Sequence, residues 1–329
     1  MKHNDYHYIY NSIFAPDISE YVSLKRSAGL YFRNAAAILR QFDRLCCEKQ
    51  ISTLIIEQEL LVEWASPRLN EKTSTRSGRI SVLKGFIEFL NKKYNNIIIW
   101  PPIYGYSSNS LEFVPYIFTH IEISCIFKIA DALPVKPRTQ FHIIFPAILR
   151  VMYGCGLRVS EALLLTNEDV DLTTGLLTVR DSKFDSSRLV PISKSLQSYL
   201  IQYKNLLKCT PTCQYFFPNQ KEQPYSARTV YDKFRSVLWA AGISHGGRGN
   251  GPRVHDFRHT FAVHVLQKWI TEGADLTAMM PILSTYMGHN GIRSTAQYLR
   301  LTAEVYPELM KQVEKNCSYV IPEVSHEGD

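Results

Sequence analysis

A proline interruption about one third of the way along the chain most constrains its fold. Trp100-Pro101-Pro102 stops a series of helical segments, and Pro115 follows. Proline lacks an amide hydrogen and fixes its φ angle, so a helix does not continue through such a stretch. The 329 residues suffice for two domains with separate cores. We therefore expect an N-terminal helical domain over residues 1–115, a second domain over 116–310 and a tail over 311–329.

The N-terminal domain is predicted to be helical. Residues 1 to about 20 are polar and aromatic without a clear period, so we expect a loosely held arm there. Apolar residues then recur at helical spacing over 27–45, 55–64 and 72–94. The last segment begins with basic residues, which form either a solvated face or contacts to phosphates. The candidates for DNA contact are Arg76, Arg79 and Lys84.

The second domain is predicted to combine helices with one β-hairpin. A helix over 141–153 ends at Gly154-Cys155-Gly156, and a short helix begins near Arg158. Residues 175–192 alternate in polarity around a polar turn, which predicts an antiparallel hairpin with Lys183 in its connection. Further helices are expected over 194–207, 226–241 and 274–289, from His255 onward, and over 307–316. The predicted fold is mainly α, with a small antiparallel β-hairpin or sheet.

Composition indicates a soluble protein that is able to bind nucleic acid. The formal net charge is +7, and Lys and Arg coincide with the candidate chemical motifs. No apolar run is long enough to span a bilayer, and the N-terminus lacks the apolar core of a signal peptide, so we expect a cytoplasmic protein without membrane contact. The seven cysteines form no regular framework and are expected to be reduced thiols.

The stretch from His255 to Tyr298 carries residue types suited to chemistry on a phosphodiester. In a helix, His255 and Arg258 fall on one face, because they are three residues apart. Arginine matches phosphate oxygens, and a phenol can attack phosphorus once it loses its proton. The departing 5′-oxygen needs a general acid, for which Lys183 is the candidate. No pair of metal-binding carboxylates accompanies these residues, which disfavours a two-metal nuclease.

These motifs resemble those of the tyrosine recombinase, or phage integrase, family. The segment GCGLRVSEALLL is similar to the first arginine box of the family, HDFRHTFAVH is similar to its second box, and MGH supplies the third-box histidine. Glu161 and Asp256 are expected to orient the cations, and His259 and His264 to be structural. Arg253 and Arg293 are expected to contact the DNA backbone or solvent. The resemblance assigns catalysis to Tyr298, Arg158, Lys183, His255, Arg258 and His289.

The resemblance implies a site-specific DNA recombinase of a mobile element. It implies a core-binding N-terminal domain, a mixed α/β catalytic domain and a 3′-phosphotyrosyl intermediate at Tyr298, without a metal or another cofactor. The implied partners are double-stranded DNA with specific recombination sites, three further protomers in a homotetramer, and accessory factors that bend DNA or set direction. The enzyme would be cytoplasmic and associated with the nucleoid when bound to DNA. The last predicted helix and the tail are candidates for docking on a neighbouring protomer, and the sequence leaves open whether such docking regulates cleavage.

Three other functions share part of this pattern. A type IB topoisomerase uses the same chemistry but reseals its own strand. A zinc metalloprotease is suggested by the two histidines of HDFRH, although Arg258 would lie on the ligand face and aspartate replaces the usual glutamate. A non-catalytic DNA-binding relative is the third alternative. The Gly-rich loop over 242–253 is interpreted as a connector, because no strand precedes it and no Gly-Lys-Ser/Thr follows.

Overall fold

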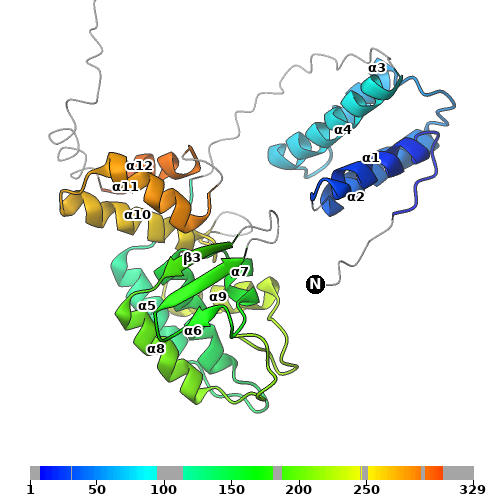
Figure 1. Cartoon of the computed structure of the whole chain (residues 1–329). Helices are drawn as coiled ribbons and strands as arrows, with labels where there is room; N and C mark the ends of the chain where they lie inside the picture. The colour runs from blue at the N-terminus through cyan, green and yellow to red at the C-terminus, as the bar shows by residue number, and fades with distance from the viewer. Residues whose placement is uncertain are drawn as a thin grey trace, which may run out of the picture. The chain divides into compact units, whose positions relative to one another are not determined.

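The chain divides into two compact units, Met1–Phe113 and Val114–Asp329. Figure 1 shows the helices and strands of each unit. No helix in the described residues is both long and apolar enough to cross a membrane. The computed structural model describes residues 8–30, 32–94, 114–180, 187–244, 246, 251–289 and 293–306.

The first unit is helical in the part that the structure describes, and α4 contacts each of the other helices there. The side chains of Phe14, Phe42, Trp64 and Phe86 are fully or almost fully buried between the helices. The rings of Phe42 and Trp64 meet edge to face, with their centroids 5.5 Å apart. The three helices predicted for this unit are therefore present. The helices are α1 (Ala15–Ser27), α2 (Arg33–Glu48), α3 (Gln58–Ala65) and α4 (Thr73–Tyr94).

The prediction of a loosely held arm up to about residue 20 is wrong from Ala15 onward, because α1 begins there. Ile18, Tyr21 and Val22 are buried at helical spacing, so this helix packs one face into the core of the unit. The segment before α1 is also held in place. The Asp43 carboxylate accepts hydrogen bonds from the backbone amides of Asn11 and Ser12, each at 2.9 Å.

The second unit combines eight helices with a small sheet in the described residues. The sheet is antiparallel in the order β1-β2-β3, with Leu177 opposite Val190. The predicted hairpin is confirmed, and β1 adds a strand that was not expected. The elements are α5 (His120–Asp131), α6 (Phe141–Cys155), α7 (Val159–Leu164), β1 (Val170–Asp171), β2 (Leu176–Arg180), β3 (Ser187–Pro191), α8 (Lys194–Leu206), α9 (Ala227–Ala240), α10 (Asp256–Thr271), α11 (Leu276–Met287) and α12 (Arg293–Val305).

Helix α6 is central to the second unit, since α5, α7, α8 and α10 all contact it. Its strongly apolar sequence agrees with this position, because most of its side chains are buried. The helix ends at Gly156, which has a φ angle of +59°. A Cβ atom on Gly156 would lie 2.5 Å from Cδ1 of Phe261 on α10. Glycine is therefore required at this turn both for its backbone conformation and for its small size.

Helices α10, α11 and α12 lie side by side and share an apolar cluster (Figure 1). Its buried members include Leu266, Met287, Tyr298 and Leu301. The cluster brings the beginning of α10, the end of α11 and the middle of α12 close to the end of α6. The fold is thus mainly α with a small antiparallel sheet, as predicted from the sequence.

We expect the change of Gly156 to alanine to lower the free energy of unfolding of the protein by about 1–3 kcal/mol more than the change of Gly242 to alanine. Both glycines have positive φ angles, +59° and +70°, but only Gly156 has an atom within 4 Å of the added Cβ. Urea unfolding of both variants measures the difference. Equal losses of stability would show that contact with Phe261 does not constrain this turn.

Candidate active site

Arg158 follows the Gly156 turn and caps the first turn of α7. Its Nη1 donates to Oε1 of Glu161 at 2.7 Å, and its Nη2 donates to the backbone carbonyl of Gly288 at 3.3 Å. Leu157, between the glycine and the arginine, is fully buried and anchors the turn. The Arg158 side chain is nevertheless 37% exposed, so its guanidinium remains accessible from solvent.

The Glu161 carboxylate is buried among three guanidinium groups. It accepts hydrogen bonds from Arg158 and from Nη1 and Nη2 of Arg188, and Nη1 of Arg258 lies 3.9 Å from Oε2. Burial alone would raise the pKa of Glu161, but hydrogen bonds from Arg188 and from the Arg158 amide outweigh it and keep the pKa low. Glu161 therefore orients the cations, as the sequence predicted, and does not act as a proton donor.

Arg258 is one of the most deeply buried polar side chains of the second unit, at 2% exposure. Its two terminal nitrogens donate to the carbonyls of Gly156 at 2.7 Å and Met287 at 2.5 Å. Burial and the neighbouring Arg158 lower its pKa to about 10, so it stays charged at neutral pH. The guanidinium is thus fixed by the ends of α6 and α11 before any substrate binds, which is the preorganisation that stabilises developing negative charge.

The histidines of the site are neutral at physiological pH. Burial, followed by the positive charge of Arg258, lowers the pKa of His255 and of His289 to about 4. His289 follows Gly288, which ends α11 in the left-handed conformation, and its Nδ1 lies 2.7 Å from Oγ1 of Thr295. A neutral imidazole can both donate and accept a proton, so these residues suit proton transfer.

Tyr298 on α12 is 1% exposed and lies within the electrostatic reach of Arg258 and Arg158. Its hydroxyl lies 3.1 Å from Nδ1 of His259, and its ring stacks with that of His289 at a centroid distance of 6.0 Å. Burial raises the pKa of Tyr298 above its ordinary value, although the charges of Arg258 and Arg158 oppose this effect. The phenol is therefore protonated in the absence of substrate, and its hydrogen-bond partner His259 is positioned to accept the proton.

The structure brings together five of the six residues predicted to be catalytic. The sixth, Lys183, lies outside the described residues, between the paired strand ends Arg180 and Ser187. The five residues come from the N-terminal ends of α7 and α10, from α10 itself, from the position after the end of α11 and from α12. They are Arg158, His255, Arg258, His289 and Tyr298.

Two residues of the site were missed in the sequence. Arg188 on β3 was not considered, yet it donates to both carboxylate oxygens of Glu161 and to the Tyr286 carbonyl. The sequence signal for Arg188 was the alternation of side chains between the two faces of β3. This alternation places Arg188 on the same face as the buried Val190. His259 was expected to be structural, but its Nδ1 contacts the Tyr298 hydroxyl.

His264, five residues further along α10 than His259, contacts Tyr153 and His120, and its expected structural role stays a prediction. Its Nδ1 lies 2.9 Å from the hydroxyl of Tyr153, and its ring stacks on that of His120 with centroids 3.9 Å apart.

The described residues contain no group of three His, Cys, Asp or Glu side chains positioned to hold a metal ion.

The prediction that Arg79 contacts DNA is wrong. Its side chain is 3% exposed, forms two hydrogen bonds with the Glu71 carboxylate and lies over the ring of Trp64. An arginine can be buried on a helix when its charge is paired and its flat guanidinium stacks on an aromatic ring, and sequence periodicity does not reveal this.

Three of the other residues predicted to bind DNA, Arg76, Lys84 and Arg253, are partly exposed. Arg76 is half-buried and donates to the Ala65 carbonyl at 2.6 Å, whereas Lys84 is half-buried on the same helix. The Arg253 side chain is 40% exposed and donates to Asp256 at 3.1 Å. Arg293 is the first residue of α12, but its side chain lies outside the described set.

The chain belongs to the phage integrase family, which it matches over residues 118–305. The predicted family and the predicted enzyme class, a tyrosine-type recombinase, are thereby confirmed. The chain is 26% identical to the putative integrase/recombinase y4rB of Sinorhizobium fredii over 315 residues, which cover 92% of this chain and 98% of the relative. It is also 26% identical to the tyrosine recombinase XerC of Oceanobacillus iheyensis, over 87% of this chain and 90% of the relative.

Two solved structures share this fold. The XerH recombinase in a post-cleavage complex with palindromic difH substrate matches 92% of this chain and 83% of its own chain, with a TM-score of 0.65 and 19% identity. The Tn1549 transposon integrase in complex with transposon right end DNA matches 86% of this chain and 94% of its own, with a TM-score of 0.62 and 16% identity. At these identities the likeness supports the fold.

We expect the protein to lose stability as the pH falls from 7 to 5. Burial lowers the pKa values of His255, His264 and His289 to about 4 and that of His259 to about 3, whereas unfolded histidine titrates near ~6.5. Below that value the unfolded chain binds protons that the folded chain does not, so stability is full above it and declines toward the folded pKa values. The free energy of unfolding should fall by at least about 2 kcal/mol between these pH values.

Urea unfolding at pH 7, 6 and 5 measures this dependence. A variant with His259 changed to asparagine should show a shallower decline, because one titrating group has been removed. A free energy of unfolding that stays constant from pH 7 to 5 would show that these imidazoles are not held neutral by the fold.

Proposed function

We propose that the chain is a site-specific recombinase that cleaves and rejoins DNA of a mobile element, with Tyr298 as the nucleophile. The observation that carries this proposal is the buried Tyr298 hydroxyl beside His259, within the electrostatic reach of Arg158 and Arg258. Membership of the phage integrase family supports it independently.

The cleavage step follows from the chemistry of these groups. The Tyr298 oxygen attacks the scissile phosphorus and gives up its proton, for which the neutral imidazoles of His255 and His259 are the available acceptors. Arg158 and Arg258 stabilise the negative charge on the phosphate oxygens. The bond between phosphorus and the 5′-oxygen breaks, and Lys183 donates the proton that makes this oxygen a 5′-hydroxyl. The strand then remains attached to the enzyme through a 3′-phosphotyrosyl link.

Rejoining reverses these steps with a new strand. A 5′-hydroxyl of the partner duplex attacks the phosphotyrosyl link, so the phosphoester energy is retained and no external energy source is needed. Two rounds on two duplexes require four protomers, and we therefore propose a homotetramer on paired recombination sites, with accessory factors that bend DNA or set direction. We also propose that the protein acts in the cytoplasm, at the nucleoid.

The first unit is proposed to act as the core-binding domain that holds the duplex. A chain with a net charge of +7 is able to neutralise several phosphates, and binding should therefore weaken steeply with salt. A DNA ligand is supported by solved structures of this fold, since a lambda integrase dimer is bound to a COC' core site and XerH is bound to difH substrate.

We expect the wild-type protein to form SDS-resistant adducts with DNA in cells that carry the gene and its native flanking DNA, and the Tyr298→Phe variant to form none. Tyr153→Phe is the matched control, because Tyr153 is also a tyrosine whose hydroxyl contacts a histidine of α10, at 2.9 Å. This control should form adducts like the wild type. Sequencing of the attached DNA identifies the site.

The outcomes separate the alternative functions. Adducts at one short inverted repeat would support a site-specific recombinase. Adducts scattered without sequence preference, together with relaxation of supercoiled plasmid, would instead indicate a type IB topoisomerase. Tight DNA binding without any adduct in the wild type would leave a non-catalytic DNA-binding protein.

We expect the Lys183→Ala variant to cleave a normal strand about 10²–10⁴ times more slowly, because the 5′-oxygen then leaves without a proton donor. A substrate with sulfur in place of this bridging oxygen should be cleaved at nearly the wild-type rate, since a thiol of pKa near ~8.5 leaves without protonation. Single-turnover gel assays measure both rates, with Lys194→Ala as the control. If the sulfur substrate is cleaved as slowly as the normal one, Lys183 is not the general acid.

A further inference from the structure

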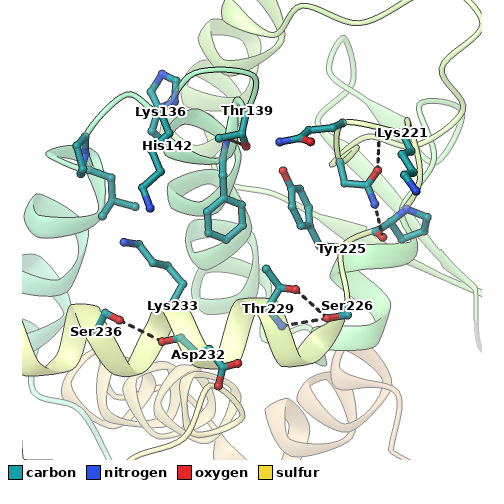
Figure 2. Close-up of a pocket in the computed structure, with 16 residues that line it drawn as sticks. Lys136, Thr139, His142, Lys221, Tyr225, Ser226, Thr229, Asp232, Lys233 and Ser236 are labelled. Carbon is teal, nitrogen blue, oxygen red and sulfur yellow. Dashed lines mark hydrogen bonds between the residues drawn. The ribbon is translucent and has the colours of Figure 1, made fainter.

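A pocket of about 830 Å³ lies at the N-terminal end of α6, in the second unit. Its walls come from the connection between α5 and α6, the first turn of α6, the turn over 219–225 and helix α9 (Figure 2). The candidate active site adjoins the other end of α6, and a helix of 15 residues is roughly 22 Å long. The pocket is therefore separate from the residues assigned to catalysis, and its volume is typical of small-molecule sites.

The described residues that line this pocket include more basic than acidic side chains. Three lysines line it, Lys136, Lys221 and Lys233. Among the described residues its only acidic side chain is that of Asp232, which already accepts a hydrogen bond from Arg228 at 2.8 Å. Among the residues that the structure describes, none of the three ammonium groups pairs with a carboxylate. The described lining of the pocket thus carries an excess of positive charge.

Two of these lysines repel each other across the pocket. Figure 2 shows Lys136 and Lys233 extending toward one another from opposite walls. Burial and the charge of Lys136 both lower the pKa of Lys233, which means that the surroundings disfavour its charged form. An anion placed between the two ammonium groups would turn this repulsion into two attractive contacts.

The remaining walls favour a ligand with a flat apolar part. The rings of Phe141 and Tyr225 lie beside each other with centroids 4.9 Å apart, and both line the pocket. The hydroxyls of Ser226 and Thr229 are engaged with each other at 2.8 Å, so the lysines are the main groups available to hold charge. The volume exceeds what a phosphate ion alone would fill, and an aromatic wall next to cations suits a nucleotide.

We infer that this pocket binds a nucleotide, with its phosphate between Lys136 and Lys233 and its base beside Phe141 and Tyr225. The nucleotide is either free in solution or at an unpaired end of a DNA strand, because both sources present a phosphate next to an unstacked base. This second site is distinct from the phosphodiester that Tyr298 is proposed to attack.

Titration of the full-length protein with AMP, followed by isothermal calorimetry, tests binding of a free nucleotide. We expect the double variant Lys136→Gln, Lys233→Gln to bind AMP at least about 10-fold more weakly than the wild type. The control variant Lys128→Gln, Lys194→Gln removes the same charge from two exposed positions of this unit and should bind like the wild type. Folding of the pocket variant is checked by thermal melting, which we expect to show no loss because a repulsion is removed.

Binding to an oligonucleotide duplex with single-stranded ends, over a series of salt concentrations, tests the second source. If DNA occupies the pocket, the pocket variant should bind the duplex more weakly than the control variant, and its salt dependence should correspond to about two fewer phosphate contacts. If AMP binding falls while duplex binding matches the control, the ligand is a free nucleotide. The inference is wrong if the wild type does not bind AMP and the two variants bind the duplex with equal affinity and salt dependence.

Discussion

The candidate active site depends on one buried carboxylate. Glu161 holds Arg158 and Arg188 by hydrogen bonds and lies 3.9 Å from Arg258, so a single negative charge orients three positive ones. A buried ion pair adds little net stability, but loss of one partner leaves a charge without compensation, which makes such an arrangement hard to change. Because cations outnumber the anion, the site retains the positive charge that a phosphodiester needs in its transition state.

This excess of positive charge also sets the state of the proton-transfer groups. The guanidiniums and the burial together keep His255 and His289 neutral, while the Tyr298 phenol keeps its proton in the absence of substrate. A bound phosphate would compensate the cations and make protonation of the imidazoles easier. The same balance of charge therefore couples substrate binding to the ability of the histidines to accept the proton of the nucleophile.

Local sequence signals predicted much of the fold and most of the candidate site. Helical periodicity and glycine stops placed α2, α4 and α6, and alternation placed the β2-β3 hairpin, because these patterns depend on residues near each other in the chain. Two of the errors involve contacts between different elements of the fold. Arg79 is buried because it pairs with Glu71 and stacks on Trp64, and Arg188 belongs to the site because β3 brings it to Glu161.

The sequence by itself determined the chemical groups, their order and the family to which they belong, because motif spacing survives in the chain whatever its fold. Tertiary structure alone decided which cation faces which anion, that His259 and not His255 contacts the Tyr298 hydroxyl, and that a lysine-lined pocket forms at the far end of α6. The physical reason is that burial and electrostatic environment are properties of several elements packed together. Residues such as Lys136 and Lys233 are 97 positions apart (233 − 136), and only packing of the α5–α6 connection against α9 makes them neighbours.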